Sequence, residues 1–354
     1  MSLERRSRLR PVLSSLRPYV AGRGIEEISR IYGIPPERIV KLGSNENPYG
    51  PSPDVRKAIA EAPLNLYPEV DGLIESISSY TGFPESQVLI GSGMDGVIDT
   101  LSRLFLDHGV RAVIPTPTFS FYEIVTILCG GEPVFVRRSD PSELIEHLGD
   151  DRIGMVFICS PNNPTGEVMD EDVLRSVIES TEGVVFLDEA YVEFAERSMV
   201  DLVNEYENLV VGRTMSKAFG LAGVRLGYAL APEWIAEAYR KAAPPFFGVT
   251  TPAVAAGIAA LGDLEHMRRS VELIKRERKL LLSEIVEASP SWGNFLYIET
   301  SERSDVITER MLRKGIIVRD CRSFRDAGDH HIRVTVGTPE QNARFLEAYR
   351  EICG

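Results

Sequence analysis

A glycine-rich stretch, VLIGSGMDGVID at 88–99, is the first segment that could do chemistry. Gly91, Gly93 and Gly96 follow an apolar run and match the dinucleotide fingerprint G-x-G-x-x-G. A nicotinamide site also needs an acid about 20 residues further on. The next expected strand, at 111–114, is followed instead by PTPTF. The glycines therefore indicate a turn whose backbone N–H groups, at a helix N-terminus, face some phosphate, although a tight turn without a ligand remains an alternative.

Three other stretches carry side chains that complete a single chemical requirement. Lys217 and Arg225 lie eight residues apart in RTMSKAFGLAGVRLG, Asp188 follows the apolar run VVFL, and Phe119 lies in PTPTFSFY. Pyridoxal phosphate requires a lysine for a Schiff base, an acid facing its ring nitrogen, a phosphate cup and an aromatic ring against its face. Each residue alone could be a surface lysine, a helix cap or part of an ordinary turn. Together with the glycine turn they predict a pyridoxal-phosphate enzyme.

The predicted chemistry gives two of these side chains distinct electrostatic roles. Lys217 would be both the covalent anchor of the cofactor and the base that moves the substrate proton. Asp188 would pair with the protonated ring nitrogen, so we expect that charge to hold the pKa of the carboxyl group low.

The elements that must position these residues are strands ending near one another. Short β-rich runs alternate with helical patterns between residues 88 and 230. We expect helices starting at Gly96, in TFSFYEIVTILCG and in EDVLRSVIEST. The expected strands are QVLI, RAVIP, EPVFV, IGMVFICS, GVVFLDEA, NLVVGRT and VRLGYALA. This alternation is typical of an α/β fold with a mostly parallel sheet sandwiched by helices.

The pattern changes around Pro244-Pro245. We expect one long helical stretch over Thr251–Val286, followed by the strands NFLYIET, IIVRD and HIRVTVG and by two more helices. This mixture suits a smaller α+β domain. The predicted parts of the chain are an N-terminal arm with part of the small domain at 1–45, a large cofactor-binding domain at 46–245, and a small C-terminal domain at 246–354.

Composition narrows the class of protein. The 354 residues include 39 Lys and Arg against 52 Asp and Glu, a net charge of −13 that disfavours nucleic acid and anionic membranes. No segment approaches about 18 consecutive apolar residues, so we expect no membrane span. The Arg-rich start, MSLERRSRLRPVLSSLRPYV, could pass for a transit peptide. Glu4 and the lack of an apolar core favour a solvated arm.

Cysteine and histidine usage argues against a metal site. Cys129, Cys159, Cys321 and Cys353 lie far apart without a C-x-x-C motif, which indicates reduced thiols in a cytoplasmic protein. His330-His331 is the one adjacent histidine pair, and we expect a solvated turn there. The sequence therefore predicts no bound metal.

Motifs along nearly the whole chain, from about Tyr19 to Gly337, carry a family resemblance. They are KLGSNENPYGPSP, NLYPE, SPNNPTG, DEAYVEF, TMSKAFGLAGVRLG, GIIVRD and IRVTVGT. The sequence resembles the fold-type I pyridoxal-phosphate aminotransferases and, within them, the histidinol-phosphate aminotransferase family. The resemblance implies interconversion of histidinol phosphate plus 2-oxoglutarate with imidazole-acetol phosphate plus glutamate, a step of histidine biosynthesis.

The resemblance also implies residue roles around the cofactor. Lys217 would hold it covalently, Asp188 would face its ring nitrogen, and Tyr191 and Asn163 would hydrogen-bond its phenolic oxygen. Phe119 would stack on the ring. The implied phosphate site consists of Gly93, Met94 and Asp95 at the glycine turn together with Thr214, Ser216 and Arg225.

Substrate and subunit contacts are implied in the same way. Arg333 would grip the carboxylate of glutamate or the phosphate of histidinol phosphate, with Arg319, Tyr19 and Asn163 assisting. A sheet-edge salt bridge is the alternative reading for Arg319. Tyr67 would reach the phosphate of the cofactor in a neighbouring subunit, which implies a homodimer.

Three positions depart from the family pattern. Gly96 stands where glutamate is frequent, Thr214 where serine is usual, and Phe119 where tyrosine is frequent. The hydroxyl and the stacking ring survive these changes, so none undermines cofactor binding.

Two related activities remain open at this point. Threonine-phosphate decarboxylases share the fold, the cofactor and a phosphorylated substrate. Aromatic amino acid aminotransferases belong to the same subgroup.

Overall fold

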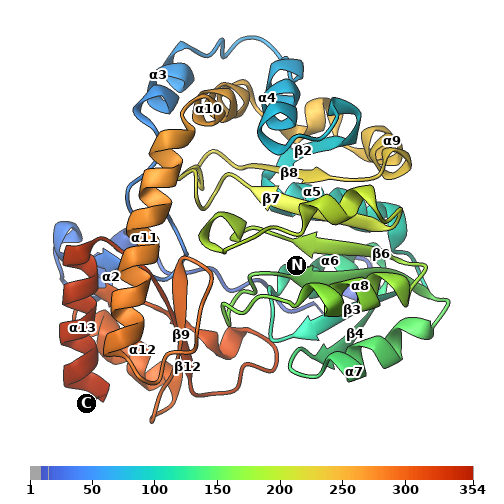
Figure 1. Cartoon of the computed structure of the whole chain (residues 1–354). Coiled ribbons are helices and arrows are strands. Elements are labelled where there is room, and N and C mark those ends of the chain that lie inside the picture. The colour runs from blue at the N-terminus through green and yellow to red at the C-terminus, as the bar shows by residue number, and fades with distance from the viewer. Residues whose placement is uncertain (1–8, 15, 354) are drawn as a thin grey trace.

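The computed structural model describes residues 9–14 and 16–353, and its central feature is a seven-stranded sheet (Figure 1). The antiparallel strand β8 separates β2 from β7, and the remaining neighbours run parallel. The predicted α/β fold with a mostly parallel sheet is confirmed. In spatial order the strands are β2 (Val88–Ser92), β8 (Leu226–Leu230), β7 (Leu209–Thr214), β6 (Val184–Asp188), β5 (Ile153–Cys159), β3 (Arg111–Thr116) and β4 (Glu132–Arg137).

Both faces of this sheet are buried, which explains the nearly continuous apolar runs of its strands. Along β6, Val184 and Phe186 pack into one apolar cluster, while Val185 and Leu187 pack into the other. This alternation follows the two-residue period of a strand. One cluster is completed by α5 (Gly93–Phe105), α6 (Phe121–Cys129) and α9 (Glu233–Ala242), the other by α7 (Pro141–Glu146) and α8 (Glu171–Glu179).

A second, smaller sheet lies beside the first. Antiparallel strands β9 (Phe295–Glu299), β12 (His331–Thr335) and β11 (Arg319–Asp320) form it, with β12 in the middle. Next to it β1 (Val40–Lys41) pairs in parallel with β10 (Ile316–Ile317), so residues near the start of the chain join residues near its end. Helix α12 (Ser304–Arg313) packs on β10, β11 and β12, and α11 (Leu264–Glu284) packs on β9. Helices α2 (Ile25–Tyr32) and α13 (Pro339–Cys353) pack in turn on α12.

The long helix expected over Thr251–Val286 is two helices. They are α10 (Thr251–Gly262) and α11 (Leu264–Glu284), and the break lies at Asp263, whose side chain accepts a hydrogen bond from the backbone N–H of His266. The apolar pattern continues through the break, so periodicity alone could not reveal this N-cap.

The two helices have different neighbours, which bears on the predicted domain division. Helix α10 packs on α3 (Pro53–Glu61) and α4 (Asp71–Thr81), whereas α11 runs down toward the smaller sheet (Figure 1). The division at residue 245 stays a prediction, and this packing favours moving the boundary to Asp263.

The histidine pair, the cysteines, and the search for membrane helices and metal-binding groups complete the description of the fold. His331 begins β12 and its ring stacks on Tyr297 with centroids 4.5 Å apart, so the expected turn is limited to His330. All four cysteines are free thiols. Within residues 9–14 and 16–353, no helix is long and apolar enough to cross a membrane, and no group of three or more His, Cys, Asp or Glu could hold a metal ion.

Candidate active site

The main cavity lies where the carboxyl ends of the central strands meet the smaller sheet. Strands β2, β5, β6 and β7 all point in one direction, so their ends bring distant residues to one edge of the sheet. Arg319 and Arg333 approach from β11 and β12. Thirteen of the sequence-predicted residues line this cavity: Tyr19, Met94, Asp95, Phe119, Asn163, Asp188, Tyr191, Thr214, Ser216, Lys217, Arg225, Arg319 and Arg333.

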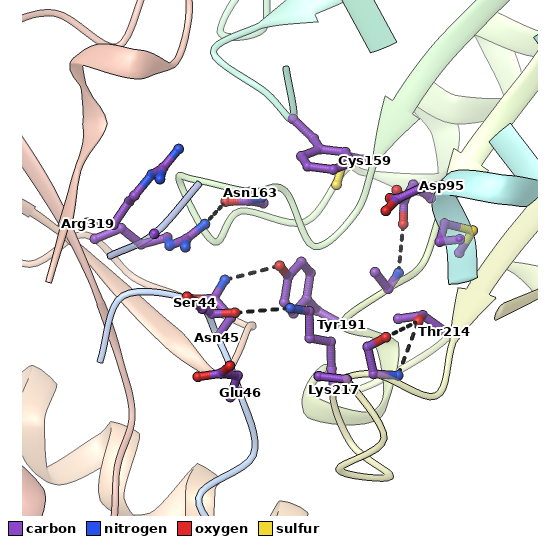
Figure 2. Close-up of a pocket in the computed structure, with 18 of the residues that line it drawn as sticks. Ser44, Asn45, Glu46, Asp95, Cys159, Asn163, Tyr191, Thr214, Lys217 and Arg319 are labelled. Atoms are coloured by element: carbon purple, nitrogen blue, oxygen red, sulfur yellow. Dashed lines mark hydrogen bonds between the residues drawn. The ribbon is translucent and has the colours of Figure 1, made fainter. Parts of the chain in front are cut away.

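Lys217 follows β7 and its amine reaches into the cavity (Figure 2). Its Nζ donates to the carbonyl oxygen of Ser44 at 3.2 Å and lies 5.7 Å from the ring centroid of Tyr191. Burial, followed by the charge of Arg333, lowers the pKa of this amine to about 8. A substantial fraction of the amine is therefore neutral near pH 7.5, the form that can act as nucleophile and base.

Asp188 is the last residue of β6 and is 3% exposed. Its Oδ1 accepts from the backbone N–H of Ala190 at 2.9 Å, and its Oδ2 accepts from the hydroxyl of Tyr122 at 2.6 Å. Burial raises the pKa of this carboxyl group to about 6, with the hydrogen bonds acting in the opposite direction. The low pKa expected from the sequence presupposed a neighbouring cationic ring, so it describes a different state of the site.

The glycine turn forms a cradle at the start of α5. Gly93 has φ of +72°, and a Cβ there would lie 2.7 Å from Nη2 of Arg225, so a larger residue would displace the guanidinium. The helix begins at Gly93, three residues earlier than expected, because Gly93 can adopt this conformation and its N–H bonds to the carbonyl oxygen of Arg225. Gly96 is not crowded, since a Cβ there would come no closer than 3.5 Å to another atom. The third glycine of the apparent dinucleotide motif is thus not required by the turn.

Side chains around this cradle suit an anion. Arg225 pairs with Asp95 at 2.7 Å on a half-exposed rim. Thr214 donates its hydroxyl to Ser216 Oγ at 3.0 Å and accepts from the Ser216 backbone N–H at 3.1 Å. Hydroxyls, a guanidinium and the free N–H groups of a helix N-terminus are the groups that bind phosphate in proteins.

Tyr191 and Asn163 lie on the opposite wall of the cavity. Tyr191 accepts a hydrogen bond from Nδ2 of Asn45 at 3.0 Å, and Asn163 Oδ1 accepts one from Nη1 of Arg333. Asn45 is buried, and its carbonyl oxygen accepts from the Asn294 amide at 3.0 Å. Asn45 lies in the sequence motif KLGSNENPYGPSP, but no role for it could be assigned from the sequence.

Arg319 and Arg333 face each other as directly paired residues of β11 and β12. Both are buried, and the Nε atom of each lacks a hydrogen-bond partner. Arg333 donates Nη2 to the carbonyl oxygen of Gly43 at 2.9 Å, and Arg319 donates Nη2 to that of Val20 at 2.6 Å. Among the described residues neither guanidinium forms an ion pair, and the neighbouring carboxylate of Asp320 pairs with Arg322 instead, so the salt-bridge alternative for Arg319 is wrong. Two buried cations without a counter-ion form a site for an external anion.

Aromatic residues form the outer wall. Phe119 meets the ring of Tyr19 edge-on, with centroids 6.2 Å apart, and Tyr19 lies 6.0 Å from Cζ of Arg319. The segment around Tyr19 thus lies on the side of the cavity where Arg319 is, and Gly22 also lines it there.

Gly93 and Tyr67 are the predicted site residues that do not line the cavity. Gly93 lies directly behind it, against Arg225. Tyr67 lies in the loop between α3 and α4, is 79% exposed and stacks on Phe246 with centroids 4.8 Å apart. Its predicted role requires a second subunit.

Tyr122 is the residue that sequence analysis missed. It is fully buried in α6 and hydrogen-bonds Asp188, although 66 residues separate the two in sequence. Phe119 lies outside α6, so no helical spacing links it to Tyr122 and the sequence offered no local signal for this contact.

The residues present fit pyridoxal phosphate. A buried amine, a buried carboxyl group, a cradle for an anion and an aromatic wall surround one cavity, and the two unpartnered Nε atoms of Arg319 and Arg333 add a second anion site. This donor set contains one position for each group that the cofactor requires.

Comparison with known proteins gives consistent findings. Residues 37–348 match the family model described as aminotransferase class I and II. The chain is 49% identical to a histidinol-phosphate aminotransferase of Methanosarcina mazei, over 99% of this chain and 98% of that protein. A crystal structure of histidinol-phosphate aminotransferase from Sinorhizobium meliloti in complex with pyridoxal-5'-phosphate matches with a TM-score of 0.86 and 26% identity, covering 98% of this chain and 97% of that one.

A decarboxylase shares the fold as well. The crystal structure of L-threonine-O-3-phosphate decarboxylase from Porphyromonas gingivalis matches with a TM-score of 0.79 and 21% identity, covering 88% of this chain and 99% of that one. At this identity the likeness shows the fold alone, so it does not favour the decarboxylase alternative.

Proposed function

Since the chain belongs to the class I and II aminotransferases, and within them to the histidinol-phosphate aminotransferases, we propose that it interconverts histidinol phosphate plus 2-oxoglutarate with imidazole-acetol phosphate plus glutamate. The observation that carries the substrate assignment is the pair of buried arginines, Arg319 and Arg333, which lack a counter-ion beside the Lys217 amine. Both substrates of this reaction bring an anion to that position.

Pyridoxal phosphate is the cofactor, and when bound it supplies an aldehyde that bonds to amines and a ring that withdraws electrons from the reacting carbon. Lys217 would hold the cofactor through its amine, and the same amine is placed to accept a proton from the substrate and to donate it back. Its lowered pKa, about 8, suits this role because the neutral amine is far more populated near neutral pH than that of an ordinary lysine.

Asp188, Tyr191 and Asn163 orient the ring. Asp188 lies at the carboxyl end of the central strand β6. Both of its oxygens already accept hydrogen bonds from the protein, so its carboxyl group is fixed before a ring nitrogen arrives. Tyr191 and Asn163 offer a hydroxyl and an amide for the phenolic oxygen of the cofactor. Arg225, Thr214, Ser216 and the N-terminus of α5, with Gly93, Met94 and Asp95 in its first turn, would hold the cofactor phosphate.

Arg333 binds the anion of each substrate in turn. A guanidinium forms two parallel hydrogen bonds to a carboxylate or to a phosphate with similar geometry. Arg319 adds a second positive charge for the phosphate, and Tyr19 closes the outer side. A single site can therefore serve the glutamate half and the phosphorylated half of the reaction.

The test is an assay of the cofactor-loaded enzyme with alternative substrates. We expect turnover with histidinol phosphate plus 2-oxoglutarate, and a fall in kcat/KM of at least about 10²-fold with histidinol, which lacks the phosphate that the arginine pair binds. Release of CO₂ from threonine phosphate without 2-oxoglutarate would instead select the decarboxylase. Turnover of phenylalanine or tyrosine at the histidinol-phosphate rate would select the aromatic aminotransferase.

The cofactor itself has an independent test. The purified protein should absorb in the visible range, and borohydride should abolish that band by reducing the bond between the cofactor and Lys217. A protein without such a band that binds NAD would contradict the cofactor assignment.

A homodimer completes the proposed site. Tyr67 and its neighbours Leu64 and Leu66 are strongly exposed, and Phe246 stacks on Tyr67 from the segment before α10. Exposed apolar residues gathered in this way are typical of a subunit interface. Tyr67 would then reach the cofactor phosphate of the partner. Light scattering should give twice the monomer mass, and Tyr67→Phe should loosen cofactor binding without dissociating the dimer.

The free thiols support a reducing compartment. All four cysteines are unpaired, and two of them are buried. Proteins kept in the cytoplasm retain such thiols, so the proposed site of action is the cytoplasm, where amino-acid biosynthesis takes place.

A further inference from the structure

Tyr122 connects two walls of the cavity without lining it. Its hydroxyl donates to Oδ2 of Asp188 at 2.6 Å. Its ring meets that of Phe119 edge-on at 5.6 Å and stacks on Phe157 at 4.8 Å with an angle of 8° between the planes. The side chain is fully buried, so its ring is held by packing on one side and by the carboxylate on the other.

The carboxyl group of Asp188 uses its two oxygens differently. Oδ1 accepts from the backbone N–H of Ala190 at 2.9 Å, which any residue at position 190 other than proline would supply. Oδ2 accepts from Tyr122, which is the one side chain among the described residues that hydrogen-bonds Asp188. An ionised carboxylate has about four lone-pair positions. Two hydrogen bonds therefore fix its rotation and leave room for a third donor.

The other groups near Asp188 do not substitute for this hydrogen bond. Lys217, after β7, favours the ionised carboxylate, whereas Asp95, on α5, opposes it. Cys159, on β5, is a buried thiol whose pKa is raised to about 12 by burial, so it carries no charge at neutral pH. Burial of Asp188 disfavours its ionised form, and a donor hydrogen bond favours it.

We propose that Tyr122 is a positioning residue for the transamination site, whose hydroxyl fixes the Asp188 carboxyl group and keeps it ionised so that it can pair with the ring nitrogen of the cofactor. The inference rests on the proposed function only for its cofactor and needs no particular substrate. Tyr122 itself touches neither substrate nor cofactor in this role.

The test compares Tyr122→Phe with Tyr239→Phe. Both tyrosines are buried and donate one hydrogen bond, and Tyr239 donates to the carbonyl oxygen of Ile90 at 2.9 Å, away from the cavity. In Tyr122→Phe we expect cofactor affinity and kcat to fall about tenfold, with the KM for glutamate unchanged, because a hydrogen bond to a charged group is lost. The acidic limb of the pH–rate profile should move up by about one pH unit. Both variants should lower Tm by similar amounts. Tyr239→Phe, however, should leave cofactor affinity, kcat and the pH–rate profile unchanged.

A double-mutant cycle separates action through Asp188 from a general packing effect. Cofactor affinity, read from the visible absorption during titration, is measured for Tyr122→Phe in the wild-type and Asp188→Asn backgrounds. We expect about a tenfold loss in the first and less than a twofold loss in the second. An equal loss in both backgrounds, or a Tyr122→Phe enzyme with wild-type affinity and pH profile, would overturn the proposal.

The same titration distinguishes a failure of the proposed function from a failure of the role assigned to Tyr122. Wild-type protein that binds no pyridoxal phosphate would sink the proposed function. Wild-type protein that binds it, beside an unaffected Tyr122→Phe variant, would sink only the role of Tyr122.

Discussion

The two halves of the cavity satisfy their polar atoms in different ways. On the central-sheet side, both oxygens of Asp188 accept hydrogen bonds from the protein, and Thr214 and Ser216 bond each other. On the small-sheet side, Arg319 and Arg333 face each other with an unpartnered Nε each, and neither forms an ion pair within the described chain, where Asp320 pairs with Arg322. Under the proposed function, the half that would hold the cofactor is organised in advance, whereas the half that would hold the substrate would be completed by the anion that enters it.

This difference predicts that substitutions on the two sides of the cavity should affect different properties of the enzyme. Changes on the central-sheet side should alter cofactor retention and the visible spectrum. Changes on the small-sheet side should alter substrate kinetics and leave the spectrum intact. A central-sheet variant that alters only substrate kinetics, or a small-sheet variant that alters the spectrum, would contradict this comparison.

Lys217→Ala should have the largest effect. It removes both the covalent anchor and the base, so turnover should fall by about 10³-fold or more, with loss of the cofactor's visible band. Lys241→Ala, an exposed lysine on α9, is the control for altered charge. Single-turnover kinetics with glutamate would measure the loss, and a Lys217→Ala enzyme working at near wild-type rate would refute the assignment.

Asp188→Asn should lower turnover by about 10²-fold or more, because the ring nitrogen loses its charged partner. In the cofactor-free protein, by contrast, we expect Asp188→Asn to increase stability at neutral pH. Burial raises the pKa of Asp188 to about 6, against about 3.9 in an unfolded chain. Between these pH values the folded chain holds the proton more tightly, so the contribution of this group to the free energy of unfolding falls as pH rises.

Thermal melts of the cofactor-free protein would detect this. Asp188→Asn should raise Tm relative to wild type at pH 7.5, and the gain should vanish near pH 4, where the wild-type carboxyl group is protonated in the folded chain. A constant difference in Tm across that range would show that the carboxyl group is not destabilising when ionised.

Arg333→Lys should weaken both half-reactions, by about 10- to 10²-fold in kcat/KM, because lysine keeps the charge but not the paired hydrogen bonds. The cofactor spectrum should stay unchanged. Arg350→Lys, which changes an exposed ion pair on α13, is the matched control. Kinetics in which only one of glutamate and histidinol phosphate is affected would overturn the shared anion site.

Phe119→Tyr should have the smallest effect, within about twofold, because the ring is retained and the added hydroxyl lies beside the open cavity. Phe119 lies at the border of the two halves, against Tyr19 on one side and Tyr122 on the other. Cofactor affinity and KM measured together would show which half it belongs to. A change of more than tenfold in either would contradict a purely stacking role.

Much of this architecture could be predicted from the sequence because the signals are local. A buried strand followed by Asp188, and another followed within three residues by Lys217, determine where these side chains emerge from the sheet. The glycine turn at Gly93 could be recognised from the sequence, but the reason that a side chain is excluded there could not. The atom that a Cβ would meet belongs to Arg225, which is 132 positions later. Tyr122 could not be assigned for the same reason. Its partner lies on strand β6, 66 positions later, and helical periodicity indicates only that its face of α6 is buried.

The helix break at Asp263 shows a different limit. The apolar residues on both sides keep a helical period, and the cap depends on one side chain that bonds His266 and also accepts from Ser52 Oγ. A competing tertiary contact of this kind leaves no periodic trace in the sequence.

The parallel pairing of Val40 with Ile316 has a consequence for biosynthesis of the chain. A ribosome that adds about 5–20 residues per second leaves the β1 segment waiting roughly 14–55 s for its partner to emerge. The hydrogen bond between Asn45 and Thr335 waits longer still, because Thr335 follows Asn45 by 290 positions. The nascent central sheet is thus exposed at its cavity edge during translation, and the site closes only when synthesis has passed β12.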